Sequence, residues 1–288
     1  MAYELNAKKK DLGGFSVRRI LPHADKPAVG PFIFFDHMGP VEFSAGEGIN
    51  VRPHPHIGLA TVTYLLEGSI LHRDSIGNIQ EIFPGDVNWM TAGRGIVHSE
   101  RETLEVRSRV HRADGFQVWL ALPQGYAQVE PAFFHFNRNA LPHIMHDGVM
   151  MRLIAGSAYG RVSPVRTFSP MFYLDIIAEK DRTIDRPEPD MEAAAYVQQG
   201  EIEISGVRYS AGAFVILEAG DAHIKMIHAG RMMLLGGEPF ATPPHIEWNF
   251  AAFDYRLIEE AKKRWRDGGF GVIPGDQLEH IPLPGETG

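Results

Sequence analysis

Two short segments of the chain carry side chains that could bind one metal ion. His54 and His56 lie two residues apart, and His98 and Glu100 repeat that spacing further along the chain. In an extended strand, residues i and i+2 point to the same face, so the members of each pair can share one cation. The prolines on either side of His54 keep the first segment out of a helix. The two pairs therefore predict a site on facing strands of a small barrel.

Three imidazoles and a carboxylate would hold a divalent transition metal and leave coordination positions open. This donor set accepts Fe(II), Mn, Ni, Co, Cu or Zn, and the general order of affinities does not choose between them. The chain has no cysteine, so the thiolates that usually close a structural zinc site are excluded. The alternative is a chance arrangement among 14 histidines, but the second pair at matching spacing favours the metal site. Open positions would let a substrate or dioxygen bind.

The elements that must position these residues are predicted to be strands. Short apolar stretches bounded by Gly, Pro or Asp recur along the chain, which is typical of strands joined by tight turns. In the first half they cover residues 32–35, 60–66, 86–90 and 116–122, and in the second half residues 171–178, 193–197, 213–217 and 232–235. The pattern predicts an all-β protein.

An internal repeat predicts two similar β domains. Tyr64 and Gly68 match Tyr196 and Gly200, and a second pair of glycines, Gly85 and Gly93, matches Gly212 and Gly220. We therefore predict a metal-binding barrel over residues 1–130 and a second barrel over residues 131–245.

The same repeat predicts that the second barrel lacks the metal site. Its offsets place Arg186 and Glu188 at the positions of His54 and His56, and Lys225 and Ile227 at those of His98 and Glu100. These side chains cannot reproduce the donor set of the first barrel.

The last segment, residues 246–288, is predicted to form one helix and an extended tail that pack on the barrels. Over residues 251–266, Leu257, Ile258, Ala261 and Trp265 share one side at helical spacing. Two glycines then end the helix, and the proline-rich residues 272–288 follow.

Charge and hydropathy exclude some functions. The formal net charge is −8 and the estimated pI is near 5.9, so no basic field attracts phosphates and direct nucleic-acid binding is not expected. No apolar run is long enough to cross a bilayer, and the first residues have no signal-peptide character. The sequence predicts a cytoplasmic protein without a membrane partner.

Three segments together resemble the pirin family. Residues 34–40 read FFDHMGP, residues 54–68 read HPHIGLATVTYLLEG, and residues 91–100 read TAGRGIVHSE. The resemblance is dense from residue 32 to residue 123 and thins through the second half. Pirins are bicupins, so it implies two cupin β-barrels (double-stranded β-helices, or jelly rolls) face to face.

The resemblance also implies a mononuclear metal, usually iron, in the N-terminal barrel. Its ligands would be His54, His56, His98 and Glu100. The general cupin pattern has a glutamate shortly after the two histidines, where this chain has Thr61. Glu100 would supply the carboxylate instead, as in pirins.

Several bacterial pirins have quercetin 2,3-dioxygenase activity, so the resemblance implies a dioxygenase that cleaves flavonols such as quercetin with O2. Glu100 would then be a ligand, a general base, or both. One alternative is a metal-dependent regulatory protein, a co-regulator or redox sensor with a protein partner. Another is a cupin enzyme that acts on a small organic acid.

Several other side chains are candidates either for a substrate pocket or for the core. Phe35, Met38, Gln117 and Trp119 could line a substrate pocket, although such residues on strands usually belong to the core. His37 could support the site or simply be bonded at a turn. Residues 135, 143 and 146 are histidines without strand spacing, which predicts that they lie in loops.

Overall fold

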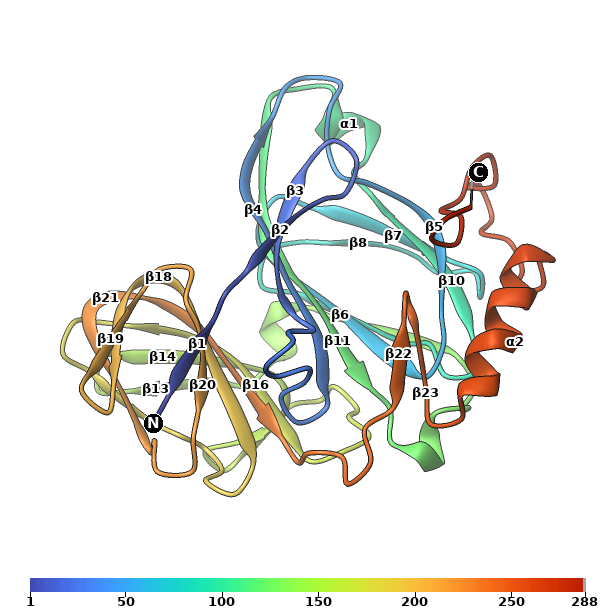
Figure 1. Cartoon of the computed structure of the whole chain (residues 1–288). Helices are drawn as coiled ribbons and strands as arrows, with labels where there is room; N and C mark the ends of the chain where they lie inside the picture. The colour runs from blue at the N-terminus through green and yellow to red at the C-terminus, as the bar shows by residue number, and fades with distance from the viewer. Residues whose placement is uncertain (287–288) are drawn as a thin grey trace. The chain divides into compact units, whose positions relative to one another are not determined.

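The computed structural model describes residues 1–286, and their contacts group them into two compact units. One unit, here called the N-barrel, consists of residues 9–19, 35–138 and the described residues from 242 onward. The other, the C-barrel, consists of residues 1–8, 20–34 and 139–241. Strands dominate both units (Figure 1), so the predicted all-β class is confirmed.

Two sheets form the N-barrel. Their strands are β2 (Lys8–Asp11), β3 (Ser16–Leu21), β4 (Phe32–Phe43), β5 (Asn50–His56), β6 (Leu59–Glu67), β7 (Ile70–Asp74), β8 (Ile79–Ile82), β9 (Val87–Thr91), β10 (Ile96–Arg101), β11 (His111–Ala121) and β12 (Ala132–Phe136). The smaller sheet has the order β5-β10-β7-β8, and the larger has the order β12-β9-β6-β11-β4-β3-β2. Buried side chains of both sheets, such as Leu65 of β6 and Ile82 of β8, share one core cluster. The unit is therefore a sandwich closed around a core, as expected of a jelly roll.

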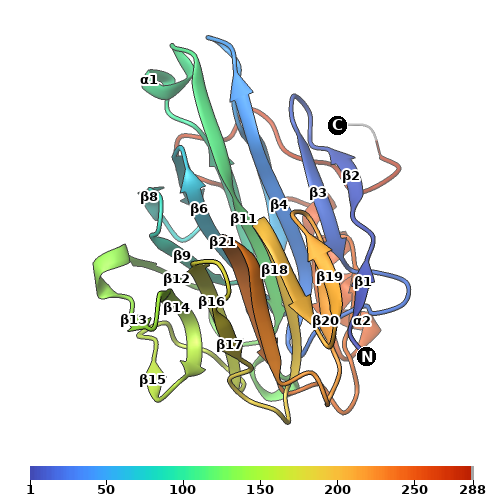
Figure 2. The same ribbon diagram turned by 90° about the vertical axis from the view of Figure 1, so that its left-hand side faces the viewer.

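One branched sheet forms the C-barrel (Figure 2). Its strands are β1 (Tyr3–Leu5), β13 (His143–His146), β14 (Val149–Ala158), β15 (Arg161–Val162), β16 (Met171–Ala178), β17 (Thr183–Asp185), β18 (Glu192–Ile204), β19 (Val207–Ser210), β20 (Phe214–Leu217) and β21 (His223–Gly237). The central order is β1-β20-β18-β21-β16-β14-β13. Apolar side chains of these strands fill the interior with one core cluster.

The C-terminal segment packs on the N-barrel as a hairpin and a helix. The hairpin strands are β22 (His245–Glu247) and β23 (Phe250–Ala252), and the helix is α2 (Tyr255–Arg266), which lies beside β5 and β10 in Figure 1. Asp254 caps the helix by accepting a hydrogen bond from the backbone N–H of Arg256. The predicted helix is confirmed, but it starts later than expected because residues 250–252 pair in the hairpin instead.

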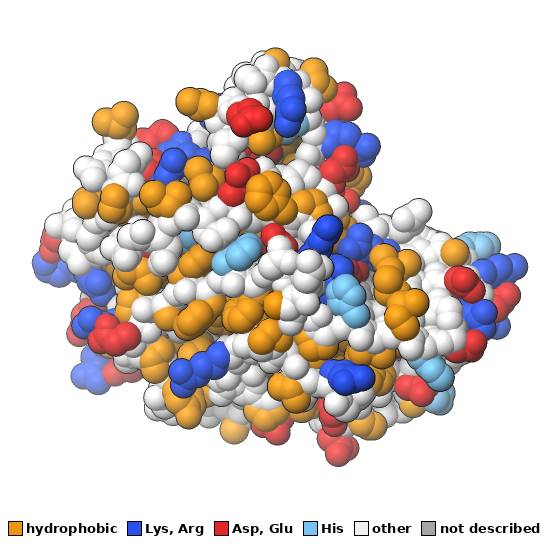
Figure 3. Space-filling view, turned by 180° about the vertical axis from the view of Figure 1, so that it is seen from behind, with side chains coloured by type: hydrophobic (Ala, Val, Ile, Leu, Met, Phe, Trp, Pro, Cys, Tyr) orange, Lys and Arg blue, Asp and Glu red, His pale blue; other side chains and the backbone are white. Residues whose placement is uncertain are grey.

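Short helical turns complete the chain: α1 (Leu104–Arg107) and the 3₁₀ turns Gln124–Tyr126 and Arg138–Ala140. None of the helices among residues 1–286 combines the length and the apolar character needed to cross a membrane. The predicted tail follows α2, and its last two residues, 287 and 288, lie outside the described part of the chain. The face in Figure 3 carries both acidic and basic side chains.

Candidate metal centre

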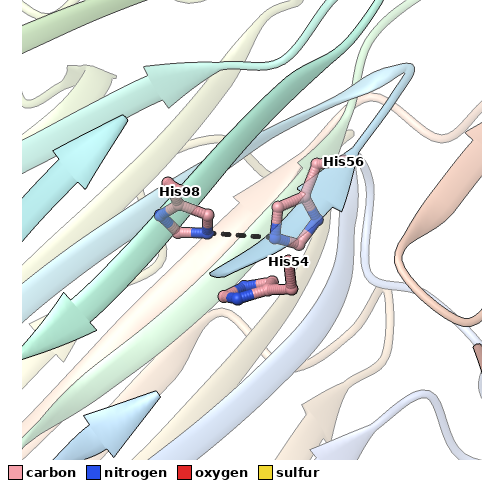
Figure 4. Close-up of side chains that lie close together, drawn as sticks. All are labelled: His54, His56 and His98. Atoms are coloured by element: carbon pink, nitrogen blue, oxygen red, sulfur yellow. Dashed lines mark hydrogen bonds between the residues drawn. The ribbon is translucent and has the colours of Figure 1, made fainter. Parts of the chain in front are cut away.

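Strands β5 and β10 bring the three predicted histidine ligands together. The strands pair antiparallel, with His98 opposite His54 and Ile96 opposite His56. All three histidines are buried, and one possible ligand atom from each lies within 4.8 Å of the others (Figure 4). The i, i+2 spacing on one strand and the cross-strand register therefore place three imidazoles on one face, as the sequence predicts.

The hydrogen bonds of two of these imidazoles show which nitrogen each one offers. The Nδ1 of His54 lies 2.8 Å from the carbonyl of Arg52, and the Nδ1 of His56 lies 3.2 Å from the carbonyl of Asn249. A carbonyl only accepts, so each Nδ1 carries the proton and donates it. Each Nε2 therefore presents a lone pair to the centre of the group.

The distance between two of these nitrogens fits a shared cation. The Nε2 atoms of His56 and His98 lie 3.1 Å apart (Figure 4). Two imidazole nitrogens bound to one ion at about 2.1 Å stand about 3 Å apart when the angle between them is near 90°. Two lone pairs at this separation repel each other unless a proton or a cation lies between them. The donor set therefore fits a mononuclear metal.

Burial keeps these imidazoles neutral. Desolvation lowers the pKa of His54 to about 4, and it also lowers the pKa of His56 and of His98, each with a further contribution from neighbouring histidines. Only a neutral imidazole has the lone pair that a metal needs. The group is therefore competent to bind a metal at neutral pH without first losing protons.

Glu100 lies on the same strand as His98, but its carboxylate is not part of the three-imidazole group. The side chain is buried, and it accepts a hydrogen bond of 2.9 Å from the hydroxyl of Thr63. The amide nitrogen of Gln117 lies 3.2 Å from both carboxylate oxygens. Desolvation by burial raises the pKa of Glu100. The larger sheet, through β6 and β11, thus holds a carboxylate ready to accept a proton.

The pKa values of the histidines predict acid sensitivity in the metal-free protein. The unfolded chain takes up protons at these imidazoles below pH 6.5, whereas folded His54 does so only near pH 4. Stability should therefore fall as the pH drops from about 6.5 to about 4, by about 3 kcal/mol for His54 alone. The raised pKa of Glu100 acts in the opposite direction, and only above pH 4.5.

Thermal unfolding in the presence of a chelator checks this. We expect a lower Tm at pH 5 than at pH 7, and a smaller difference in the variant His54→Gln. An equal Tm at the two pH values would contradict the prediction.

Two of the four candidate pocket residues contact the site. Gln117 bonds Glu100, and the ring of Trp119 packs edge-on against His56, with centroids 4.9 Å apart. Phe35 is fully buried against Phe116, and Met38 belongs to the core cluster of the N-barrel. The core interpretation therefore holds for Phe35 and Met38.

The remaining sequence candidates have structural contacts. His37 forms a 2.7 Å hydrogen bond with Asp114 and stacks on Phe116. These contacts fit the alternative that His37 is a hydrogen-bonded structural residue. The loop prediction for residues 135, 143 and 146 was wrong, because these histidines lie in β12 and β13. Strand pairing at the sheet edges, with β9 and β14, overrides the lack of a clear alternating pattern.

The structure adds residues that the sequence did not single out. His72 and Asp74 of β7 pair with β10, and the Nδ1 of His72 lies 3.4 Å from the Nδ1 of His98. Asn249, in the turn between β22 and β23, orients His56 through its carbonyl. The signal for the β7 pair was present, since His72 and Asp74 have the same i, i+2 spacing as the predicted ligands. No local signal pointed to Asn249.

The C-barrel has other side chains at the corresponding positions. Its strand β17 pairs with β21 so that Thr183 lies opposite Lys225, as His54 lies opposite His98. The repeat offset assigned Arg186 and Lys225 to the places of His54 and His98, but these two residues do not lie opposite each other, so its two assignments disagree with the strand register by three residues. Among residues 1–286, the three-imidazole group is the one cluster of three or more His, Cys, Asp or Glu with the geometry to hold a metal.

The two barrels and the buried three-imidazole group define the class of the protein, a bicupin with a candidate mononuclear metal site in its N-barrel. Residues 14–120 match the Pirin family, and residues 173–271 match the pirin C-terminal cupin domain. The chain belongs to the pirin family.

Three relatives place the chain within this family. It is 44% identical to a pirin-like protein of Caulobacter vibrioides over 97% of this chain and 98% of the relative. It is 37% identical to a Pseudomonas aeruginosa protein named "putative quercetin 2,3-dioxygenase", over 94% of this chain and 87% of that one. A crystal structure of quercetin 2,3-dioxygenase from Acinetobacter baumannii superposes with a TM-score of 0.89 at 35% identity, covering 99% of this chain and 97% of that one.

Proposed function

We propose that this chain is a metal-dependent dioxygenase of the pirin type that cleaves flavonols such as quercetin with O2. The observation that carries the proposal is the buried carboxylate of Glu100 on the same strand as His98, beside a group of three neutral imidazoles. The likeness to a quercetin 2,3-dioxygenase at 35% identity supports the same reaction class. We propose Fe(II) as the native metal, with Glu100 as its fourth ligand, as a general base, or as both.

The residues of this chain have distinct tasks in the proposed reaction. A divalent metal held by the three imidazoles would act as a Lewis acid toward the 3-hydroxyl of the flavonol. Glu100, buried beside the three imidazoles, accepts the proton of that hydroxyl as the general base. Thr63 and Gln117 donate hydrogen bonds that hold the carboxylate in one orientation. Each turnover consumes one O2 and releases one carbon monoxide as the ring opens.

Anaerobic reconstitution tests the proposal. The metal-free protein is loaded in turn with Fe(II), Mn, Ni, Co and Cu, and then mixed with quercetin and air-saturated buffer. We expect loss of quercetin absorbance together with carbon monoxide release, with at least one of the metals and not in the metal-free protein. Tight metal binding without flavonol turnover would contradict the proposed substrate. That result would favour a small organic acid or a metal-dependent protein partner.

A further inference from the structure

His72 and Asp74 form a hydrogen-bonded chain that ends on one of the candidate metal ligands. The Nδ1 of His72 lies 3.4 Å from the Nδ1 of His98, and the Nε2 of His72 lies 3.0 Å from a carboxylate oxygen of Asp74. Both side chains are buried, Asp74 completely. Burying two polar side chains costs free energy unless their donors and acceptors are hydrogen-bonded. We therefore expect each polar atom of His72 and Asp74 to have a partner.

The proton positions along this chain follow from its two ends. In a neutral imidazole one nitrogen donates and the other accepts, so when the Nε2 of His72 donates to Asp74 its Nδ1 carries the lone pair. That lone pair can only accept, and the group that faces it is the Nδ1 of His98. His98 therefore carries its proton on Nδ1, and its Nε2 presents a lone pair beside the Nε2 of His56.

All three imidazoles thus have the same organisation. His54 and His56 each donate from Nδ1 to a backbone carbonyl, and His98 donates from Nδ1 to His72. In each case the outer contact directs the Nε2 lone pair toward the shared centre. An outer contact that fixes the tautomer of a ligating histidine is a recurring feature of metal sites.

The surroundings hold the His72 ring and the Asp74 carboxylate in place. The ring of His72 stacks on Phe133 with centroids 4.2 Å apart and an angle of 14° between the planes. Asp74 accepts hydrogen bonds from the backbone N–H groups of Ile76 and Asn78, at 3.1 and 2.9 Å, and from the side-chain amide of Asn78 at 2.8 Å. The turn that follows β7 therefore fixes the orientation of the carboxylate.

The geometry points to His72 and Asp74 as positioning residues of the metal centre, which set the tautomer and the orientation of His98 and thereby raise its affinity for a divalent metal. The inference rests on the metal site named in the proposed function. It does not depend on the substrate, and it is tested without turnover.

Metal affinity of the full chain provides the test. The probe is Ni(II), competed against a chromophoric chelator, and the absorption spectrum of bound Co(II) reports on the geometry of the ligands. His72→Phe keeps the stacking on Phe133 but removes both hydrogen bonds, so we expect the Kd for Ni(II) to rise by about 10- to 100-fold and the Co(II) spectrum to change. His72→Gln offers an acceptor to His98 and a donor to Asp74, so it should recover most of the affinity.

A double-mutant cycle separates this role from a purely structural one. Asp74→Asn keeps an oxygen for the backbone N–H groups but no longer fixes the proton on the Nε2 of His72, so it should weaken Ni(II) binding by a similar factor. In the His72→Phe background the same substitution should change the Kd little further, because the hydrogen bonds between Asp74, His72 and His98 are already lost. Ser75→Ala is the control. It removes the acceptor of the Val97 N–H, which takes no part in the hydrogen bonds of His72 and Asp74, and it should leave the Kd for Ni(II) within about twofold of that of the unmodified protein.

The outcomes distinguish this inference from the proposed function. A lower Tm with an unchanged Kd in His72→Phe would overturn the positioning role while leaving the metal site intact. Failure of the unmodified protein to bind Ni(II) or Co(II) would overturn the metal site itself, and this inference with it.

Discussion

His98→Ala is expected to abolish stable metal binding. The imidazole of His98 is fully buried, and its Nε2 lies 3.1 Å from that of His56, so alanine removes a donor from the middle of the group. Loss of an outer contact at a metal site typically costs 10- to 100-fold in affinity, and loss of a ligand itself should exceed that range. We therefore expect the Kd for Ni(II) or Fe(II) to rise by more than about 100-fold and turnover of quercetin to cease.

Metal content after reconstitution and gel filtration measures this effect. The matched control is His135→Ala, because His135 also lies in a strand of the N-barrel and bonds a side chain, that of Asn88. It lies outside the three-imidazole group. The control should retain one metal per chain, whereas His98→Ala should elute without metal. Retention of metal by both variants would mean that the ion binds elsewhere.

The grouping of the three imidazoles could be predicted because it depends on local geometry. Two residues at i and i+2 of a strand face the same side whatever the rest of the fold does. His54 and His56 satisfy that condition alone, and His98 needed only a strand paired beside them. The sequence pattern therefore predicted three of the side chains at the centre without a structure.

The supporting contacts could not be predicted, because they depend on register between distant segments. His72 contacts His98 because β7 pairs with β10 in the register that places Asp74 opposite His98. Asn249 reaches His56 because the C-terminal hairpin bridges to Ile57, next to the histidine. Strand register is set by turn lengths and by the packing of the whole barrel, and spacing within one segment does not reveal it.

The mismatch between the repeat offset and the strand register has the same origin. The matching glycines fix the sequence offset between the two barrels only near the turns that they occupy. The loop before β17 differs in length from the loop before β5, so the offset changes between them. The register of β17 against β21 places Thr183, not Arg186, opposite Lys225, the residue that the offset assigns to the place of His98. Both assignments give a side chain that cannot replace an imidazole, so the predicted difference between the two barrels does not depend on the offset.

Glu100→Gln is expected to lower kcat strongly while the protein still binds its metal. The substitution keeps the size of the side chain and its bond with Thr63, but an amide cannot accept the proton of the flavonol hydroxyl. General-base catalysis typically contributes 10²- to 10⁴-fold, so kcat should fall by about that factor. Three imidazoles remain, so we expect the variant to bind Ni(II) or Fe(II), more weakly than the unmodified protein if Glu100 is also a ligand.

The matched control is Glu102→Gln, a buried carboxyl two residues further along the chain. Glu102 accepts a hydrogen bond from the backbone N–H of Ile49 and bonds His111, and the oxygen of a glutamine can still accept from that N–H. Both variants are compared for kcat with quercetin, Kd for the metal, and Tm. A large fall in kcat for Glu100→Gln with a Kd close to that of the unmodified protein would assign Glu100 as the base alone. A fall in kcat together with a rise in Kd would make it a ligand as well, and an unchanged kcat would remove it from the mechanism.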